Sequence, residues 1–323
     1  MSTYLITGVA GFIGYHTAKT LLLAGHNVIG IDAMVPYYDL SLKKARLSDI
    51  QHACFEYHEF DVGNFDKLKD LLGNVSIDYI IHLAAQPGVR YSIDHPFEYG
   101  KHNLSAMLSI MEFARLRQAE IKQFVFASSS SVYGLENTVP FSVDSKILSP
   151  MSLYAATKIA DEAMAYSYAH LYKIPTVGLR FFTVYGPFGR PDMAVFSFTQ
   201  NIDHEKEITL FEKGQLKRDF TYVDDIVAGI IASCKVNHNA SDPYKIYNLG
   251  NNNPEKVTDL VSYIEKFLGK KAIIKDLPMS KGDMRETYAD ISLSQKELGF
   301  QPTVALEKGT ELFVEWYKKY YYT

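Results

Sequence analysis

The chain has 323 residues, of which 47 % are hydrophobic and 22 % charged, and its net charge is −4. This composition suits one large domain or two closely joined ones, and the lack of a basic excess argues against a nucleic-acid partner. Neither a bilayer-spanning apolar stretch nor a charged leader is recognisable, so we expect no membrane association and no signal peptide. The two cysteines, Cys54 and Cys234, form neither a disulfide framework nor a metal-binding spacing, which favours the reducing cytoplasm.

Apolar strands alternate with helical patterns in the first half of the chain. We predict strands at 4–7, 28–31, 55–60, 79–83, 124–127 and 176–180, and helices at 12–24, 65–72, 99–117 and 153–171. The strands are apolar throughout rather than alternating, as is typical of a parallel sheet covered by helices on both faces. Residues 1–180 are therefore predicted to form a doubly wound α/β domain. A short basic cluster, Lys43, Lys44 and Arg46, is interpreted as a solvated helix face.

The pattern changes after residue 180. A turn-rich stretch at 186–191 is followed by predicted helices at 194–202, 224–232, 257–267 and 304–317 and by strands at 208–211 and 246–249. We predict a second, smaller α/β domain at 181–323 that binds the substrate, with some of its elements returning to the first domain.

A glycine-rich loop, with Gly8, Gly11 and Gly14, lies between the first strand and the first helix. In this context the glycines allow a tight turn, approach of the backbone to a pyrophosphate and close packing of helix on strand, so a Rossmann-type dinucleotide site is predicted. Asp32 ends the second strand, where a carboxylate binds the adenosine ribose and disfavours a 2′-phosphate, which predicts NAD. Asp61 either contacts the adenine or caps the next helix. The expected cofactor contacts are Gly8, Gly11, Phe12, Ile13, Gly14, Asp32, Asp61, Val62, Leu83, Ala84, Ala85, Tyr154 and Lys158.

Tyr154 and Lys158 are four residues apart on a predicted helix and so share one face. A lysine ammonium beside a phenol stabilises the phenolate, the form that acts as a general base. The serine run at 128–131 follows a strand, at the edge where open α/β sheets bind their ligands. Together these residues predict a catalytic site.

These features resemble the extended short-chain dehydrogenase/reductase family, and within it the nucleotide-sugar epimerases. The resemblance covers essentially the whole chain. It is carried by the glycine loop at 8–14, the segments at 82–85 and 128–134, the Tyr154/Lys158 pair and the segment at 218–225.

The resemblance implies epimerisation at C4 of a UDP-linked sugar. Tyr154 takes the proton of the C4 hydroxyl while a hydride passes from C4 to NAD, and both return after the 4-keto sugar has turned over. Ser129 completes the catalytic set by a hydrogen bond to the C4 oxygen, and Lys158 also holds the nicotinamide ribose. The cofactor supplies the hydride chemistry, and the protein supplies position and electrostatics.

Residues next to Ser129 bear on the choice of substrate. Dehydratases of the family have an Asp-Glu pair where this chain has Ser130 and Ser131, and decarboxylases that form UDP-xylose typically have Glu at the position of Ser131. Small hydroxyls suit recognition of a C5 carboxylate, and Thr183 resembles a further donor found in glucuronate epimerases. The segments at 190–194 and 88–92 are also similar to those enzymes. The resemblance therefore implies interconversion of UDP-glucuronate and UDP-galacturonate.

Three alternatives stay open. One is a neutral UDP-glucose or UDP-N-acetylglucosamine 4-epimerase, in which position 183 is usually Asn. Another is a UDP-glucuronate decarboxylase, which Ser131 opposes. The third is a protein that keeps the fold and cofactor without turnover, which the intact Ser129, Tyr154 and Lys158 oppose.

Several residues of the second half complete the expected substrate site. Arg218 matches the diphosphate-binding arginine of the family, a role that suits a planar guanidinium, and Phe211 is expected beside the uracil. The full set of expected substrate contacts is Arg90, Ser129, Ser130, Ser131, Thr183, Arg190, Phe211, Arg218 and Asp283. No metal site is expected.

The resemblance also implies a homodimer in which two long helices of each subunit pack together, here 99–117 and 153–171. The apolar residues Met107, Ile110, Met111 and Ala114 suit such an interface, and they equally suit packing of the helix on the sheet.

Overall fold

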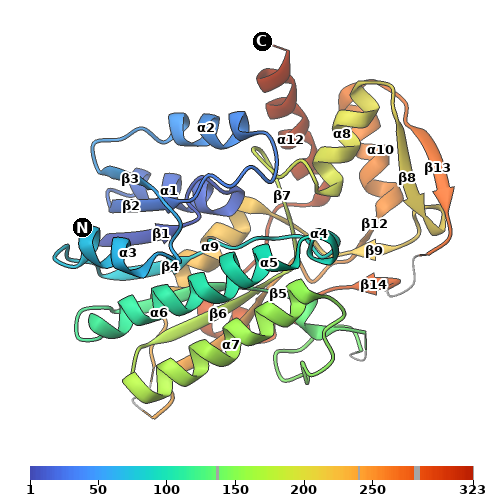
Figure 1. The fold of residues 1–323 in the computed structure, drawn as a ribbon. Coiled ribbons are helices and arrows are strands. Elements are labelled where there is room, and N and C mark those ends of the chain that lie inside the picture. Colours follow the sequence, from blue (N-terminus) through green and yellow to red (C-terminus); the bar gives the residue numbers. More distant parts are fainter. Residues whose placement is uncertain (136–137, 239–240, 280–283, 323) are drawn as a thin grey trace.

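The computed structural model describes residues 1–135, 138–238, 241–279 and 284–322. A seven-stranded sheet forms its centre, with the strand order β11-β6-β5-β4-β1-β2-β3. Every neighbouring pair in this sheet is parallel. The strands are β1 (Thr3–Thr7), β2 (Asn27–Asp32), β3 (Phe55–Glu59), β4 (Tyr79–His82), β5 (Gln123–Ser129), β6 (Thr176–Phe181) and β11 (Tyr244–Leu249). The predicted doubly wound α/β fold is confirmed, because both faces of this sheet are covered by helices (Figure 1).

The sheet separates two apolar cores. Helices α1 (Phe12–Leu23) and α9 (Val223–Ser233) contribute to the core on one face, and α11 (Ser292–Leu298) packs beside α9. Helices α3 (Phe65–Leu72), α6 (Ala106–Leu116) and α7 (Leu153–Tyr172) cover the other face. Within β5, Val125 belongs to the first core and Phe124 and Phe126 to the second. This strand is therefore apolar on both sides, as expected for a central strand of a parallel sheet.

The predicted helix at 99–117 is wrong as a single α-helix. It consists of α5 (Pro96–Tyr99), the π-helical segment η1 (Gly100–Ser105) and α6, and a further turn, α4 (Tyr91–Asp94), precedes it. The wider π turn presents Asn103, whose Nδ2 donates to Thr157 Oγ1 (2.9 Å) while its Oδ1 accepts from the Gln86 backbone N–H (2.7 Å). Local deviations of this kind often accompany functional sites.

The apolar residues of α6 that suited either a dimer interface or packing on the sheet face the sheet. Met107, Ile110, Met111 and Ala114 are completely buried within the chain. Their packing on the sheet accounts for the apolar pattern, and they are not available to a second subunit.

Short elements of the second half form a smaller unit beside the sheet (Figure 1). It contains the pairs β7 (Thr183–Tyr185) with β10 (Phe220–Tyr222) and β8 (Glu207–Phe211) with β13 (Ile273–Leu277). Strand β9 (Lys217–Arg218) lies between β12 (Glu255–Lys256) and β14 (Glu286–Thr287). The helices are α8 (Ala194–Asp203), α10 (Val257–Leu268) and α12 (Leu306–Tyr321), and η3 (Glu212–Gly214) is a short 3-10 turn. A similar turn in the first half of the chain, η2 (Ser130–Tyr133), follows β5. Strand β11 leaves this unit and pairs with β6 in the main sheet.

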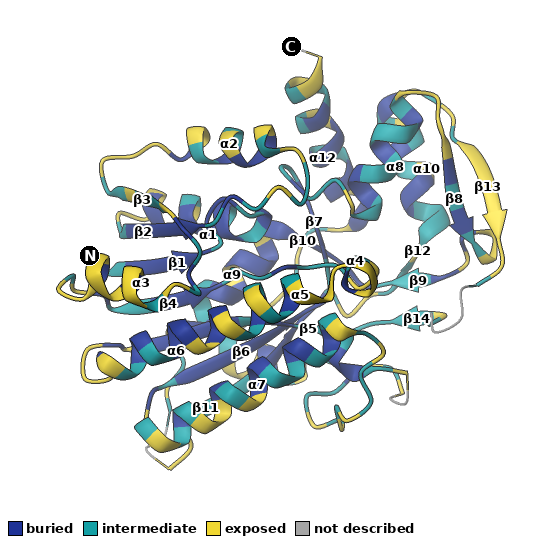
Figure 2. Ribbon diagram, in the orientation of Figure 1, coloured by how far each residue is buried: buried dark blue, intermediate teal, exposed yellow. Residues whose placement is uncertain are grey.

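The basic cluster lies on α2 (Leu40–Asp49), a helix whose bounds were not predicted. Its interpretation as a solvated face is wrong for two of its three members, since Arg46 is completely buried and Lys43 is 8 % exposed. Lys44 is exposed, and Figure 2 shows the mixture of buried and exposed positions along α2. The burial of Arg46 is compensated by hydrogen bonds to the Ala10 (2.8 Å) and Phe188 (2.7 Å) carbonyls, so that its charge is solvated by backbone dipoles.

Among the helices that the structure describes, none has the length and apolar character needed to cross a bilayer.

Candidate active site

One cavity of about 1130 Å³ lies at the carboxyl ends of the sheet strands. Segments that follow β1, β2, β4, β5 and β6 line its floor and walls, and the second half of the chain closes it through Arg190, Phe211 and Arg218. In a parallel sheet all strands end at the same edge, which explains why residues far apart in sequence meet here.

The glycine-rich loop forms a narrow cradle at one end of this cavity. Gly8 has φ +75°, and a Cβ at Gly14 would lie 2.1 Å from the Gly8 carbonyl oxygen. A side chain at either position would disrupt the turn before α1, whose N-terminus faces the cavity at Gly11 and Phe12. Backbone N–H groups at a helix N-terminus favour an anion such as a pyrophosphate. The cradle therefore fits a dinucleotide.

Asp32 stands at the end of β2 with its carboxylate almost fully engaged. Oδ2 accepts from the Ala10 backbone N–H (3.1 Å), and Oδ1 accepts from the Met34 N–H (2.8 Å) and pairs with Lys43 Nζ (3.2 Å). Both Asp32 and Lys43 line the cavity. The carboxylate that is expected to bind the ribose is therefore paired with Lys43, a side chain that was predicted to be solvated.

Asp61 lies on the cavity wall and does not cap α3. The cap of that helix is Asn64, whose side chain accepts from the Lys67 N–H (3.1 Å). The Asp61 carboxylate instead lies 3.3 Å from His102 Nδ1 and accepts from the Gly63 N–H. The His102 hydrogen bond lowers the pKa of Asp61 to about 2 against the opposing effect of burial. Of its two expected roles, the capping role is therefore wrong.

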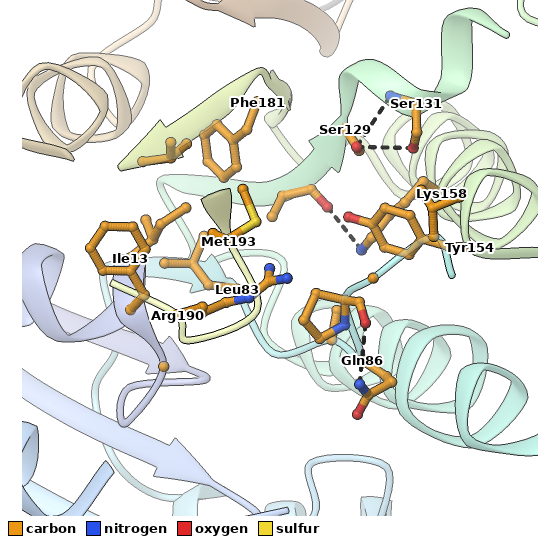
Figure 3. A pocket seen from close by; sticks show the side chains of 18 of the residues that line it. Ile13, Leu83, Gln86, Ser129, Ser131, Tyr154, Lys158, Phe181, Arg190 and Met193 are labelled. Atoms are coloured by element: carbon orange, nitrogen blue, oxygen red, sulfur yellow. Dashed lines mark hydrogen bonds between the residues drawn. The ribbon is translucent and has the colours of Figure 1, made fainter. Parts of the chain in front are cut away.

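Tyr154 and Lys158 lie in the first turns of α7, which begins after Ser152; the Ser152 side chain accepts from the Ala155 N–H. Both side chains point into the cavity from the same wall (Figure 3). Lys158 Nζ donates to the Ala127 carbonyl (3.0 Å) and to Asp161 Oδ2 (3.0 Å). The end of β5 and the first turns of α7 are therefore tied together by the lysine.

Ser129 ends β5 across from this pair, and Ser130 and Ser131 begin η2. Ser131 Oγ lies 2.9 Å from Ser129 Oγ, and the Ser131 backbone N–H also donates to Ser129 Oγ (Figure 3). All three serines and Thr183 line the cavity. The site thus offers several neutral hydroxyls beside a tyrosine and a lysine, which suits hydrogen bonding to an oxygen-rich substrate.

A buried polar network lies behind the serines. Ser128 Oγ donates to Glu162 Oε1 (2.5 Å), and Glu162 forms a bidentate ion pair with Arg180 (2.9 and 2.8 Å). Arg180 Nη1 in turn donates to Tyr133 Oη (3.0 Å). Because these groups are buried and partnered, they hold the ends of β5 and β6 in register with α7.

Arg218 and Arg90 reach the cavity from the two halves of the chain. Arg218 Nη1 donates to the Lys217 (2.8 Å) and Met284 (2.9 Å) carbonyls. The Arg90 guanidinium lies over the Phe211 ring, 5.7 Å from its centre. Asp219, the neighbour of Arg218, is completely buried and accepts from the backbone N–H groups of Asn251, Asn252 and Ala289. This anchor positions the strand that carries Arg218.

Arg190 is held by Asp192, which is held in turn by Tyr37. Its guanidinium forms two hydrogen bonds with Asp192, and Tyr37 Oη donates to Asp192 Oδ2 (3.0 Å). Burial disfavours the charge on both groups, but their pairing prevails, so the pKa of Asp192 is lowered and that of Arg190 raised. Tyr37 follows β2 and Asp192 belongs to the second half, so this contact joins the two parts of the chain across the cavity.

The structure brings all of the expected site residues that it describes into this single cavity. Asp283 lies outside the described residues. The sequence analysis missed Tyr37, Lys43 and Gln86, which also line the cavity. The position of Gln86, directly after the 82–85 segment, was an available signal, whereas the places of Tyr37 and Lys43 depend on the path of the chain after β2.

Among the described residues, no group of three or more His, Cys, Asp or Glu side chains is arranged to hold a metal ion.

A glycine cradle at the end of β1 and a tyrosine–lysine pair beside a strand-end serine define a dinucleotide-dependent enzyme of the short-chain dehydrogenase/reductase type. Residues 4–250 match the model of the NAD dependent epimerase/dehydratase family. The chain belongs to this family.

Named relatives match over the full length of the chain. Protein CapI from Staphylococcus aureus is 44 % identical, with 98 % of each chain covered. UDP-glucuronate 4-epimerase 4 from Arabidopsis thaliana is 43 % identical, and the match covers 99 % of this chain and 76 % of the plant protein. The crystal structure of UDP-glucuronic acid 4-epimerase from Bacillus cereus, in complex with UDP-glucuronic acid and NAD, is 33 % identical with a TM-score of 0.89, and the match covers 99 % of this chain and 100 % of the other.

Proposed function

We propose that the protein is an NAD-dependent 4-epimerase that interconverts UDP-glucuronate and UDP-galacturonate. The observation that carries this proposal is the arrangement of Ser129, Ser130, Ser131 and Thr183 in one cavity with Tyr154 and Lys158. The likeness to proteins named for this activity supports it further.

Within this proposal, the glycine cradle would hold NAD, which would supply a reversible hydride acceptor for C4. Tyr154 takes the proton of the C4 hydroxyl as C4 is oxidised and gives it back when C4 is reduced on its other face. Ser129 donates a hydrogen bond to the C4 oxygen, and the Lys158 ammonium stabilises the Tyr154 phenolate. The reaction needs no external oxidant, because the proton and the hydride that leave C4 and its hydroxyl both return.

The hydroxyls around Ser129 support an acidic rather than a neutral sugar. Ser131 and Thr183 are on two neighbouring segments, the starts of η2 and β7, and both line the cavity. Neutral donors bind a C5 carboxylate through charge-assisted hydrogen bonds without supplying an acid or base. We therefore assign recognition of the carboxylate to Ser130, Ser131 and Thr183, and recognition of the diphosphate to Arg218 with Arg90 and Arg190.

We propose that residues 1–180 bind the cofactor and residues 181–323 mainly the UDP-sugar, with β11 as the element of the second part that joins the main sheet.

We also propose a homodimer formed through the outward faces of α6 and α7. Leu108, Tyr166 and Leu171 are 46 %, 54 % and 69 % exposed there. Both cysteines are unpaired thiols, consistent with a cytoplasmic location.

The decisive experiment is incubation of the purified protein with UDP-glucuronate and NAD, followed by chromatographic separation of the products. We expect UDP-galacturonate to form until equilibrium is reached, with no net accumulation of NADH. Formation of UDP-xylose or a 4-keto pentose would identify a decarboxylase instead. Turnover of UDP-glucose or UDP-N-acetylglucosamine alone would identify a neutral epimerase.

A matched pair of variants assigns the chemistry to this cavity. Tyr154→Phe removes only the hydroxyl and is expected to abolish turnover while NAD still binds. Tyr321→Phe, at a tyrosine of α12 that is 43 % exposed and does not line the cavity, is expected to retain full activity. Equal activity in both variants would place the proton transfer elsewhere.

A further inference from the structure

The lysine of the proposed catalytic pair has a buried carboxylate as its partner. Lys158 Nζ lies 3.0 Å from Asp161 Oδ2, and the two side chains are only 3 % and 2 % exposed. They are three residues apart on α7 and so lie on the same face of the helix. A charged pair with so little access to water interacts more strongly than one at the surface.

The directions of the hydrogen bonds give this pair a geometric role. An ammonium has three N–H donors, and Lys158 directs two of them to Asp161 and to the Ala127 carbonyl. The third is left for the cavity, where Tyr154 stands on the same wall (Figure 3). Asp161 therefore orients the ammonium, although Asp161 does not itself line the cavity.

The pair also changes the charge near Tyr154. Together Lys158 and Asp161 carry no net charge, so the stabilisation that the ammonium offers to a phenolate is partly offset by the carboxylate behind it. Burial raises the pKa of Asp161, and the neighbouring ammonium opposes that rise. Asp161 Oδ1 accepts no hydrogen bond from the residues that the structure describes, so little except Lys158 stabilises this carboxylate.

Four other titratable groups lie near Lys158, Asp161 or Tyr154. His82 on β4 is buried and bonded to Thr7 (2.7 Å), and burial together with the Lys158 charge lowers its pKa to about 3, which keeps it neutral. Glu162, next to Asp161, is neutralised by Arg180. The Tyr99 ring lies edge-on to Tyr154, 6.1 Å between centres. Arg190, on the second half of the chain, is paired with Asp192.

We propose that Asp161 is a positioning residue that aims the Lys158 ammonium at the site of proton transfer and moderates its charge, so that Asp161 sets the pH range in which Tyr154 acts as a base. This inference rests on the proposed function. It assigns to Asp161 two separable effects, one through its hydrogen bond and one through its charge.

Two substitutions separate these effects. Asp161→Asn keeps a side-chain oxygen that can accept from Lys158 and removes the negative charge. Asp161→Ala removes both. A negative charge near a phenol opposes loss of its proton, so its removal lets the base form at lower pH. The acidic limb of the kcat/KM profile of Asp161→Asn is therefore expected to move to lower pH by about 1 unit.

Asp161→Ala also frees the ammonium from its orienting contact. We expect kcat to fall by about tenfold or more, as for the loss of one hydrogen bond to a charged group. NAD binding, measured by isothermal titration calorimetry, is expected to weaken in Asp161→Ala but to remain within about twofold of wild type in Asp161→Asn. These binding measurements do not depend on turnover.

Glu307→Gln is the matched control, because it removes one carboxylate from an ion pair between α12 and Lys266 of α10, away from the cavity. Its pH profile is expected to coincide with that of wild type. Use of UDP-glucuronate deuterated at C4 establishes, through the isotope effect, that hydride transfer limits the measured rate at each pH.

The outcomes distinguish this inference from the proposed function. If wild type epimerises UDP-glucuronate and the Asp161→Asn profile matches that of wild type, the inference is overturned and the proposed function stands. A shift to higher pH would overturn it as well. If wild type does not epimerise UDP-glucuronate, the proposed function itself fails, and the calorimetric comparison of Asn and Ala still tests the positioning role. Equal loss of NAD binding in both variants would contradict that role.

Discussion

Arg190 and Asp192 form a two-point ion pair at the cavity wall, with Nε 3.0 Å from Oδ1 and Nη2 2.6 Å from Oδ2. The same carboxylate accepts a hydrogen bond from Tyr37 (3.0 Å), so Arg190 is oriented from both halves of the chain. Asp192→Ala is expected to lower kcat/KM for UDP-glucuronate by about 10-fold to 100-fold, mainly through KM, because a hydrogen-bonded charge is left without its partner. Steady-state kinetics measure this effect.

Tyr37→Phe serves as the graded control for this pair. It removes one hydrogen bond from Asp192 and leaves the ion pair, so a loss of about threefold to tenfold is expected. A larger effect for Tyr37→Phe than for Asp192→Ala would show that Tyr37 acts on the ligands directly rather than through Arg190.

Asp32 and Lys43 are expected to determine cofactor choice together. The Asp32 carboxylate disfavours a 2′-phosphate, and Lys43, 3.2 Å away, is the nearest cation that could bind one. Asp32→Asn is therefore expected to weaken NAD binding by about tenfold and to improve NADP binding relative to NAD. Isothermal titration calorimetry with both cofactors gives the ratio. In the double variant Asp32→Asn/Lys43→Met the gain for NADP should disappear, and its persistence would show that Lys43 is not the phosphate ligand.

Arg46 is expected to be essential for stability although it lies in a helix at the surface of the fold. Its buried guanidinium bonds the Ala10 and Phe188 carbonyls and Tyr38 Oη (2.6 Å), and so joins the glycine loop to the turn before Arg190. Arg46→Ala leaves these acceptors unpaired, which should cost about 3 kcal/mol of unfolding free energy and lower Tm by roughly 5 °C. Differential scanning calorimetry measures this, with the exposed neighbour Lys44→Ala as a control that should leave Tm unchanged. Equal effects of the two substitutions would contradict the structural role of Arg46.

His82 is expected to make the folded state sensitive to mild acid. Burial lowers its pKa from 6.5 to about 3 in the folded protein, so below pH 6.5 the unfolded chain binds a proton that the folded chain does not. The stability that this group contributes is thus complete above pH 6.5 and declines as the pH falls, by about 2 kcal/mol at pH 5. Urea unfolding of wild type and His82→Gln between pH 7.5 and pH 5 isolates this contribution. The variant should lose less stability on acidification, and parallel curves would show that His82 titrates alike in both states. His16, whose pKa burial lowers to about 4, remains in both proteins and cancels in the comparison.

Local sequence patterns were sufficient for most elements of the first half. The predicted helix at 65–72 has the bounds observed for α3, because its apolar spacing is a short-range feature, although its cap is Asn64 and not Asp61. The helix at 99–117 was wrong in its details, since nothing in the local pattern distinguishes a π turn from an α turn. Asn103 in the π turn bonds Thr157, 54 residues away, a contact that the local pattern does not reveal. The short strands β9, β12 and β14 were missed because each consists of two residues and forms only where its partners lie.

By itself the sequence determined the doubly wound fold, the glycine cradle and the spacing that puts Tyr154 and Lys158 on one helical face, because each of these depends on residues close together in the chain. Only the tertiary structure decided what the charged groups do. Lys158 meets the Ala127 carbonyl 31 residues away, and Arg46 meets Phe188 142 residues away. Whether a lysine or arginine is solvated or buried depends on which acceptors the folded chain brings to it. Composition and periodicity do not reveal those distant partners. The partners come together only in the folded chain, where the strands of the parallel sheet end at one edge.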